Sequence, residues 1–273
     1  MIFRYFCKLL VAVAALAALT ALTSSVAEAT TSPAPGYEQF AGCPDPGAVP
    51  TIATCFRSVT TGGVLQMGNL EIPIAKPITL SGGMTETGKF VFGSKGGLLP
   101  AKQHITGGVV GLTGFTWLVE FFGSEALTAY AVIELASNPG NQLVEPVSLP
   151  VKVHLVNSVL GSNCYIGSKT EPIDLELITG TTSPPSPNMP ITGAPGETSL
   201  TPNSVTDVTG GTYVDNSFAA PGANGCVLTL FGFPPENIDG EIDAQTGLPA
   251  EAGTNTTIQD FDSESVSAAL VYP

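Results

Sequence analysis

Apolar and polar residues alternate most clearly between residues 149 and 180. Two segments of this stretch place apolar side chains at every second position, which is the pattern of a strand with one buried face. These apolar positions are Val151, Val153, Leu155, Ile173, Leu175 and Leu177. The loop between the two segments holds Cys164 among glycine and asparagine residues, which favour turns. We therefore predict two β-strands connected by a loop that a disulfide bond anchors.

Shorter apolar segments elsewhere have the length of strands and are separated by Gly, Pro and Asn. They comprise residues 64–67, 70–74, 78–80, 90–92, 126–136, 204–208, 213–218, 227–233 and 265–272. Residues 126–136 also have a composition that suits a helix, but their alternation and the β-rich surroundings favour a strand. Residues 109–122 are the most apolar stretch after the N-terminal region, and their β-branched and aromatic content favours a buried strand or hairpin. A helix is the alternative there, although Gly111 and Gly114 disfavour it.

Two long segments are predicted to lack regular structure. Five prolines lie between Pro184 and Pro195, so residues 179–196 are expected to form an extended surface connection. Residues 234–257 are expected to form an acidic loop. Together these patterns predict an all-β protein, an antiparallel β-sandwich with long Pro/Gly-rich loops, formed as a single domain by residues 38–273. Two smaller sandwiches divided near residues 137–145, which include a turn signal, are the alternative.

The N-terminal residues have the composition of a secretory signal. Basic residues Arg4 and Lys8 precede an apolar run at residues 9–22, and small residues follow up to Ala29. We predict that residues 1–29 are a signal peptide cleaved after Ala29 and that residues 30–37 are a flexible arm. The apolar run is too short to cross a bilayer comfortably, and no later segment is long and apolar enough to do so. We therefore expect no membrane contact after cleavage.

Charge and cysteine content fit an exported protein. Removal of residues 1–29 leaves 7 basic and 22 acidic residues, a formal charge of −15, and this excess of acid disfavours nucleic acid as a partner. Four cysteines then remain: Cys43, Cys55, Cys164 and Cys226. They can form two disulfide bonds in three ways. We predict the pairs Cys43–Cys55, which are close in sequence, and Cys164–Cys226, which both lie in Gly/Asn-rich loops. A zinc site is disfavoured because no Cys-x-x-Cys motif occurs and neither histidine is suitably spaced from a cysteine pair.

The acidic residues form the only group in the sequence that suggests a chemical function. Two groups place acids at alternate positions and are weak candidates for a calcium site: Asp239, Glu241 and Asp243, and Asp260, Asp262 and Glu264. The first group does not fit an EF-hand, because Ala244 stands where the required glycine should be. A solvated acidic loop is the favoured interpretation. Two carboxylates could also hydrolyse a polysaccharide, with Asp239, Glu241 or Asp260 as candidates.

Other candidate residues have structural interpretations. The only two histidines, His104 and His154, lie in polar positions without a catalytic partner, and no catalytic motif or cofactor fingerprint is present. Trp117 lies in the most apolar stretch and is predicted to be in the core. Surface aromatic residues are expected at Tyr37, Tyr165 and Tyr213, and Asn255 begins a possible glycosylation sequence.

Four segments together resemble a group of uncharacterised proteins secreted by actinobacteria. They are an early F-A-x-C-P element at 40–44, L-G-x-x-C-Y-I-G-S at 160–168, T-G-T-T-x-P-P-x-P-N at 179–188, and V-D-N-x-F-x-x-P-G-x-x-G-C at 214–226. The resemblance covers most of the chain beyond the signal segment. It implies kinship and export but no particular activity.

These observations predict an exported, non-enzymatic extracellular or cell-surface protein that binds a cell-wall polymer or a surface protein, or contributes structurally to that surface. Strand and turn patterns dominate, ionisable groups are sparse, and the sequence indicates no cofactor. Two alternatives remain open: a secreted polysaccharide hydrolase that uses the acidic residues above, and a calcium-stabilised adhesion module.

Overall fold

The computed structural model describes residues 32–230, 232 and 234–273. The predicted signal peptide lies outside these residues. Residues 32–273 form one compact unit. It consists mainly of antiparallel strands, which confirms the predicted all-β class. Among the described residues, no helix is long and apolar enough to span a membrane.

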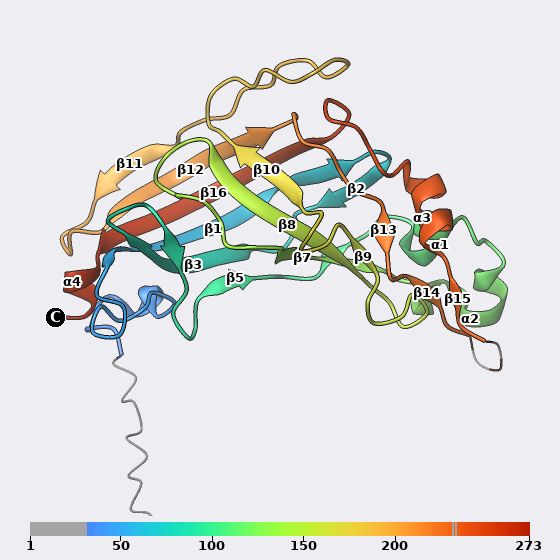
Figure 1. Ribbon diagram of the computed structural model, residues 1–273, viewed down its shortest axis with the longest axis horizontal. Helices are drawn as coiled ribbons and strands as arrows, with labels where there is room; N and C mark the ends of the chain where they lie inside the picture. Colours follow the sequence, from blue (N-terminus) through green and yellow to red (C-terminus); the bar gives the residue numbers. More distant parts are fainter. Residues whose placement is uncertain (1–31, 231, 233) are drawn as a thin grey trace, which may run out of the picture. The chain divides into compact units, whose positions relative to one another are not determined.

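The larger sheet combines strands from the beginning and the end of the chain (Figure 1). Its main strand order is β11-β12-β16-β1-β3-β4, while β2 pairs with β1 and β5 pairs with β3. The strands are β1 (Ile52–Met67), β2 (Leu70–Pro73), β3 (Ile78–Thr85), β4 (Phe90–Val91), β5 (Gly97–Leu99), β11 (Glu197–Leu200), β12 (Thr206–Asp215) and β16 (Thr256–Ser267).

The smaller sheet contains the two strands that the alternating pattern predicts. Its order is β13-β9-β8-β7-β6, and β10 also pairs with β8. The strands are β6 (Gln103–His104), β7 (Tyr130–Leu135), β8 (Val147–Val156), β9 (Tyr165–Ile166), β10 (Ile173–Leu177) and β13 (Ala223–Asn224). A separate hairpin joins β14 (Val227–Leu228) to β15 (Glu236–Asn237). Short helices complete the fold: η1 (Glu38–Phe40), α1 (Gly108–Thr113), α2 (Leu118–Ala126), α3 (Asp239–Thr246) and α4 (Ala268–Val271).

The main core lies between the two sheets. Leu65 and Met67 of β1 and Ile72 of β2 belong to the same cluster of buried residues as the apolar face of the smaller sheet. That face consists of Val151, Val153, Leu155, Ile173, Leu175 and Leu177, all at most 3% exposed. The alternation in the sequence thus correctly identifies the inward-facing residues of β8 and β10.

A second, smaller core covers the opposite face of the larger sheet at one end. Phe40 of η1 and Val271 of α4 pack there with Cys55 and Val266, which pair across β1 and β16. Residues 32–37, expected to be a flexible arm, are attached to this end. The Ala34 N–H donates to the Val271 carbonyl at 2.8 Å, and the Tyr37 hydroxyl donates to the Asn203 carbonyl at 2.9 Å.

Two disulfide bonds join the predicted pairs, Cys43–Cys55 and Cys164–Cys226. The first fixes the segment before β1 against that strand. The second connects the loop after β8 to the residue before β14, 62 positions later in the chain. All four cysteines are at most 2% exposed. Two disulfides suggest an extracellular or otherwise oxidising environment.

The central strand β1 begins at Ile52, well before the strand expected at 64–67, and the predictions for three further segments are wrong. Residues 109–122, expected to be a strand or hairpin, contribute to α1 and α2. Gly114 (φ 73°) favours the helix, because it adopts the left-handed conformation that ends α1, and Gly111 is accommodated inside it. The expected loop at 234–257 contains α3, which Gly247 (φ 71°) ends in the same way. The last strand, expected at 265–272, begins earlier at Thr256 and gives way to α4 after Ser267.

Loss of the Cys164–Cys226 bond is expected to lower the free energy of unfolding. The bond closes a loop of 62 residues, so replacement of both cysteines by serine should cost roughly 2 to 5 kcal/mol, because the unfolded chain gains conformational freedom. Denaturant unfolding of the variant and the parent would measure the difference. An unchanged midpoint and slope would contradict this role.

Alkaline pH is expected to destabilise the fold through Tyr213. Burial, and secondarily the charge of Glu145, raises the pKa of Tyr213 from 10.0 to about 12, and its ring stacks on Phe261 at 3.9 Å between centroids. The folded protein therefore holds the phenol proton more tightly than the unfolded chain does. This contribution to stability is complete below pH 10 and is lost as the pH rises towards 12. Urea unfolding between pH 10 and 12 should show a smaller loss of unfolding free energy for Tyr213→Phe than for the parent protein. Identical pH profiles of the two proteins would contradict this role of Tyr213.

Candidate functional site

Among the described residues, the most exposed aromatic cluster lies on and beside α2. Trp117 is 41% exposed, Phe121 is 73% exposed and Phe122 is 39% exposed. With Leu228, Leu230, Pro234 and Glu236 these residues line a groove of about 560 Å³, which we call the aromatic groove. The prediction that Trp117 lies in the core is therefore wrong.

The helix exposes these rings because other side chains of the segment take the buried positions. Leu118 and Leu127 are buried in the main core and fix both ends of α2. Trp117 and Phe121 are four residues apart and thus lie on one side of the helix, and their rings meet edge to face at 5.8 Å. Phe115 lies 6.0 Å from the Trp117 ring. The aromatic rings therefore extend outward from a firmly packed base.

Both sides of the groove, α2 and the β14–β15 hairpin, are held by the loop that follows β8. The Asn157 side chain, directly after β8, donates to the carbonyls of Ala126 and Thr128 at 2.9 and 2.8 Å, so it holds the end of α2. On the opposite wall, the Val227 and Thr229 N–H groups donate to the carbonyls of Leu160 and Val159. The Cys164–Cys226 bond lies at the start of that wall. Residues 157–160 thus contact both sides of the groove.

Charge around the aromatic groove is acidic. Glu236 lines it, and Glu120 and Glu125 lie on α2. No Lys or Arg occurs between residues 103 and 151 or after Lys169, so neither wall carries a basic side chain. A ligand with a negative charge would be repelled there, whereas an uncharged apolar group would gain from burial.

The acids of the first calcium candidate group stabilise local backbone. Asp239 accepts hydrogen bonds from the N–H groups of Cys226 at 2.7 Å and Gly225 at 3.2 Å. Asp243 accepts from the Ala223 N–H at 2.6 Å, and burial raises the pKa of its carboxyl. Glu241 is exposed on the first turn of α3. These contacts attach α3 to β13 and to the start of β14.

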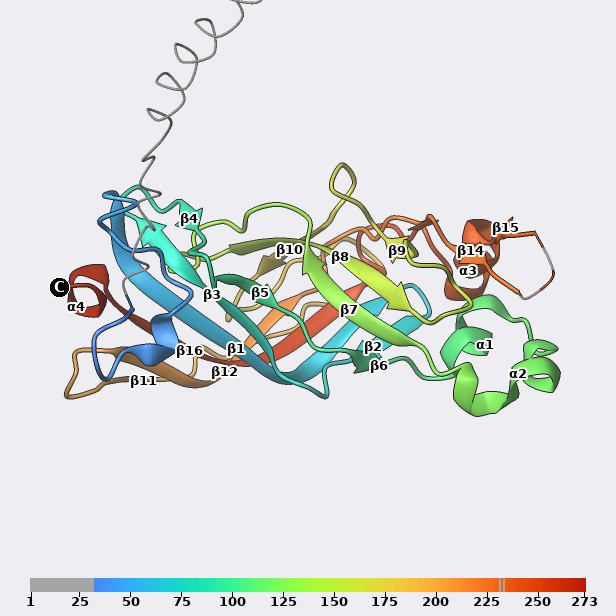
Figure 2. The ribbon, with the colours of Figure 1, turned by 90° about the horizontal axis from the view of Figure 1, so that it is seen from below.

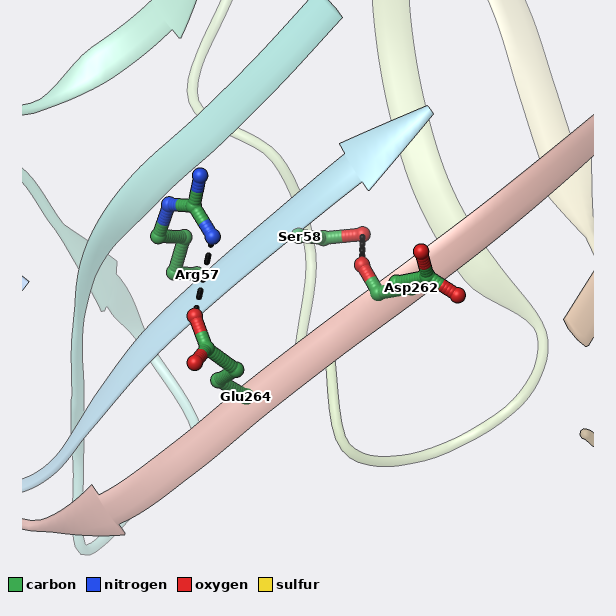
Figure 3. A network of polar contacts seen from close by, with 4 residues as sticks. All are labelled: Arg57, Ser58, Asp262 and Glu264. Carbon is green, nitrogen blue, oxygen red and sulfur yellow. Dashed lines mark hydrogen bonds and ion pairs between the residues drawn. The ribbon is translucent and has the colours of Figure 1, made fainter. Parts of the chain in front are cut away.

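The second acidic group lies along β16. Asp260 accepts from the Thr212 hydroxyl at 3.0 Å, and Asp262 accepts from the Gly210 N–H at 2.8 Å. Glu264 forms an ion pair with Arg57 of β1 at 2.9 Å (Figure 3). Throughout the part of the chain that the structure describes, no three His, Cys, Asp or Glu side chains gather closely enough to hold a metal ion.

Several other candidate residues contribute to the structure of the fold. Asn255, the first residue of the possible glycosylation sequence, is 0% exposed and donates to the carbonyls of Phe218, Ala250 and Glu251, so its amide is inaccessible in the folded protein. Tyr213, expected at the surface, is partly buried and stacks on Phe261. The motif residue Asn188 donates to the carbonyls of Asn216 and Asn255, which holds the proline-rich segment against the sandwich.

Substitutions on α2 should separate the buried base from the exposed rings. Leu118→Ala removes a fully buried side chain and should lower the free energy of unfolding by about 2 to 5 kcal/mol. Phe121→Ser removes a ring that is 73% exposed and should change the free energy of unfolding by less than about 1 kcal/mol. Chemical denaturation measures both. Equal losses for the two variants would show that Phe121 packs into the fold.

Comparison with known proteins adds no assignment. No protein-family description, curated protein or solved structure matches this chain. On the chain's own surface, the aromatic groove combines three exposed aromatic side chains with an apolar lining.

Proposed function

We propose that this chain is an exported binding protein, without catalytic activity, that holds an apolar chain of a cell-surface component in the aromatic groove. The observation that carries this proposal is the gathering of Trp117, Phe121 and Phe122 around an apolar groove of about 560 Å³. Grooves of this size are typical of sites for small ligands or for part of a larger one.

Exposure of these rings favours a binding role because it has a cost in free energy. Burial of a large apolar side chain stabilises a protein by about 1.5 to 3 kcal/mol, and Phe121 and Trp117 forgo much of this in the free protein. Contiguous exposed apolar surface commonly marks a site of interaction. A ligand that covered both rings would recover the unused hydrophobic free energy.

The chemistry of the groove selects an acyl or similar hydrocarbon group. Aromatic, leucine and proline side chains supply apolar contacts but no basic group, and Glu236 is the one charged residue of the described lining. An uncharged lipid portion fits this combination, whereas a phosphate, a carboxylate or an acidic peptide does not. The two disulfide bonds support a site of action outside the cytoplasm.

Trp117 makes the proposal directly measurable, because it is the only tryptophan in the sequence. Residues 30–273 would be titrated with octyl glucoside below its micelle concentration, and the tryptophan emission recorded. Binding of the octyl chain should shift the emission to shorter wavelength in a saturable manner, because the indole moves into an apolar environment. Glucose alone should produce no shift.

Two matched variants test the location of binding. Phe121→Ser should weaken octyl glucoside binding by roughly tenfold, the loss expected for one large apolar contact. Leu200→Ser is the control, because Leu200 is 71% exposed on β11, outside the groove. Equal affinity of both variants and the parent, or a linear response without saturation, would refute the proposal.

A further inference from the structure

A cleft opens between the larger sheet and the segment that connects β7 to β8. Residues of the segment 142–147 line one side, and side chains of β1, β12 and β16 line the other. The volume of the cleft is about 230 Å³. In Figure 1 the connecting segment passes over β12 and β16, and Figure 2 shows β11, the neighbour of β12, at the opposite end of the ribbon from α2. We call this feature the sheet cleft, and it shares no lining residue with the aromatic groove.

Hydroxyl side chains line the sheet cleft at positions that face the smaller sheet. Phe56 of β1 points towards that sheet, because it belongs to a buried cluster against which residues of β7 and β8 pack. Ser265 is paired directly with both Phe56 and Thr206, and directly paired residues project to the same side of a sheet. Ser263, two positions earlier on β16, shares this side. The inner face of a β-sandwich is normally apolar, so these three hydroxyls mark a place where the inner face meets something other than core.

Polar groups of the sheet cleft have hydrogen-bonding capacity that the described residues leave unused. Hydroxyls without a hydrogen bond to any described residue are those of Thr206, Tyr213, Ser263 and Ser265. Gln142 is only 7% exposed, and its side-chain nitrogen donates to the carbonyls of Gly140 and Ser148 at 3.1 and 3.5 Å. Its Oε1 accepts no hydrogen bond from the described residues. None of these free atoms is sealed inside the protein, so a ligand in the cleft can reach them.

The segment that forms the outer side of the cleft is fixed at both ends. The Gly140 N–H donates to the Ser148 carbonyl at 2.9 Å, which ties the start of the segment to β8. Near its other end, the Glu145 carboxylate accepts from the Thr179 N–H at 3.1 Å and from the Thr179 hydroxyl at 2.7 Å. The cleft is therefore preformed, which lowers the entropic cost of binding.

The lining favours an uncharged ligand with several hydroxyl groups. Glu145 is the one charged residue of the described lining, and its carboxylate repels anions but accepts hydrogen bonds from hydroxyls. Burial, and secondarily the charge of Glu145, raises the pKa of Tyr213, so the carboxylate and the phenol lie near each other. Leu143 and Val144, which are 53% and 60% exposed, offer apolar contacts at the rim.

We propose that the sheet cleft binds one ring of an uncharged sugar. The volume is smaller than the roughly 300 to 1,000 Å³ of sites for drug-sized ligands, which limits the occupant to a single ring. The free hydroxyls and the Gln142 Oε1 exchange hydrogen bonds with the sugar hydroxyls, while Leu143 and Val144 contact its C–H groups. This site lies outside the aromatic groove and takes a ligand of a different chemical class.

Saturation-transfer NMR on residues 30–273 would test this site. The probes are the methyl glycosides of glucose, galactose, mannose and N-acetylglucosamine, which lack the long alkyl chain that the aromatic groove takes. At least one of them should receive saturation from the protein in a concentration-dependent, saturable manner. Methyl glucuronide, which carries a carboxylate, should bind more weakly than methyl glucoside because Glu145 repels it.

Matched variants test the location of sugar binding. Tyr213→Phe and Ser263→Ala each remove one hydroxyl from the cleft and should weaken binding by roughly two- to tenfold, the loss expected for one hydrogen bond. Tyr130→Phe on β7 and Ser199→Ala on β11 make the same chemical changes outside the cleft lining and should have no effect. Phe121→Ser should also bind the sugar normally, so failure of the aromatic groove proposal would leave this one intact. Thermal melts of each variant separate a loss of binding from a loss of folding.

Three results would overturn the proposal. They are absence of saturation transfer to all four neutral glycosides, tighter binding of methyl glucuronide than of methyl glucoside, and equal affinity of the parent protein and both cleft variants for the bound glycoside.

Discussion

The pairing of β1 with β16 is the interaction on which the rest of the structure depends. Residues 54–66 align antiparallel with residues 256–267, so the beginning and the end of the described chain share a long ladder in the middle of the larger sheet. Sheet pairing over such a sequence separation has a large entropic cost, which the burial of apolar side chains must offset. The inner face of β1 provides this burial, because Leu65 and Met67 pack with the smaller sheet.

The solvent-facing features of the molecule follow from how the smaller sheet lies on this ladder. Its inner face is buried in the main core, so its outer face is left to solvent with the polar members of each alternating pair, among them Lys152 and His154. The aromatic groove lies where the chain leaves the sheet through α2 and the β14–β15 hairpin, and buried Leu118 and the Cys164–Cys226 bond fix these two walls. The fold thus exposes an apolar groove as well as a polar sheet face.

Local patterns predict β8 and β10 well but miss most of β1 and β16 and the helices, for a physical reason. Strict alternation at 151–155 and 173–177 can be satisfied only by a strand with one buried face, and these side chains are indeed buried. Residues 109–122 are mostly apolar and show no clear period, so their pattern does not distinguish a buried strand from two helices with exposed rings. The α3 segment has few apolar residues, with Ile242 fully buried, and its helix depends on contacts with β13 that no local pattern reveals.

The aromatic groove could not be predicted, because a run of apolar residues does not indicate which of its side chains will face solvent. Trp117 and Leu118 are neighbours in the sequence, yet the first is 41% exposed and the second is fully buried. Collisional quenching of the single tryptophan by acrylamide in the native protein tests this central feature most directly. We predict an emission maximum typical of a partly hydrated indole and quenching that approaches that of the unfolded chain. A short-wavelength emission resistant to acrylamide would place Trp117 in the core and contradict the account.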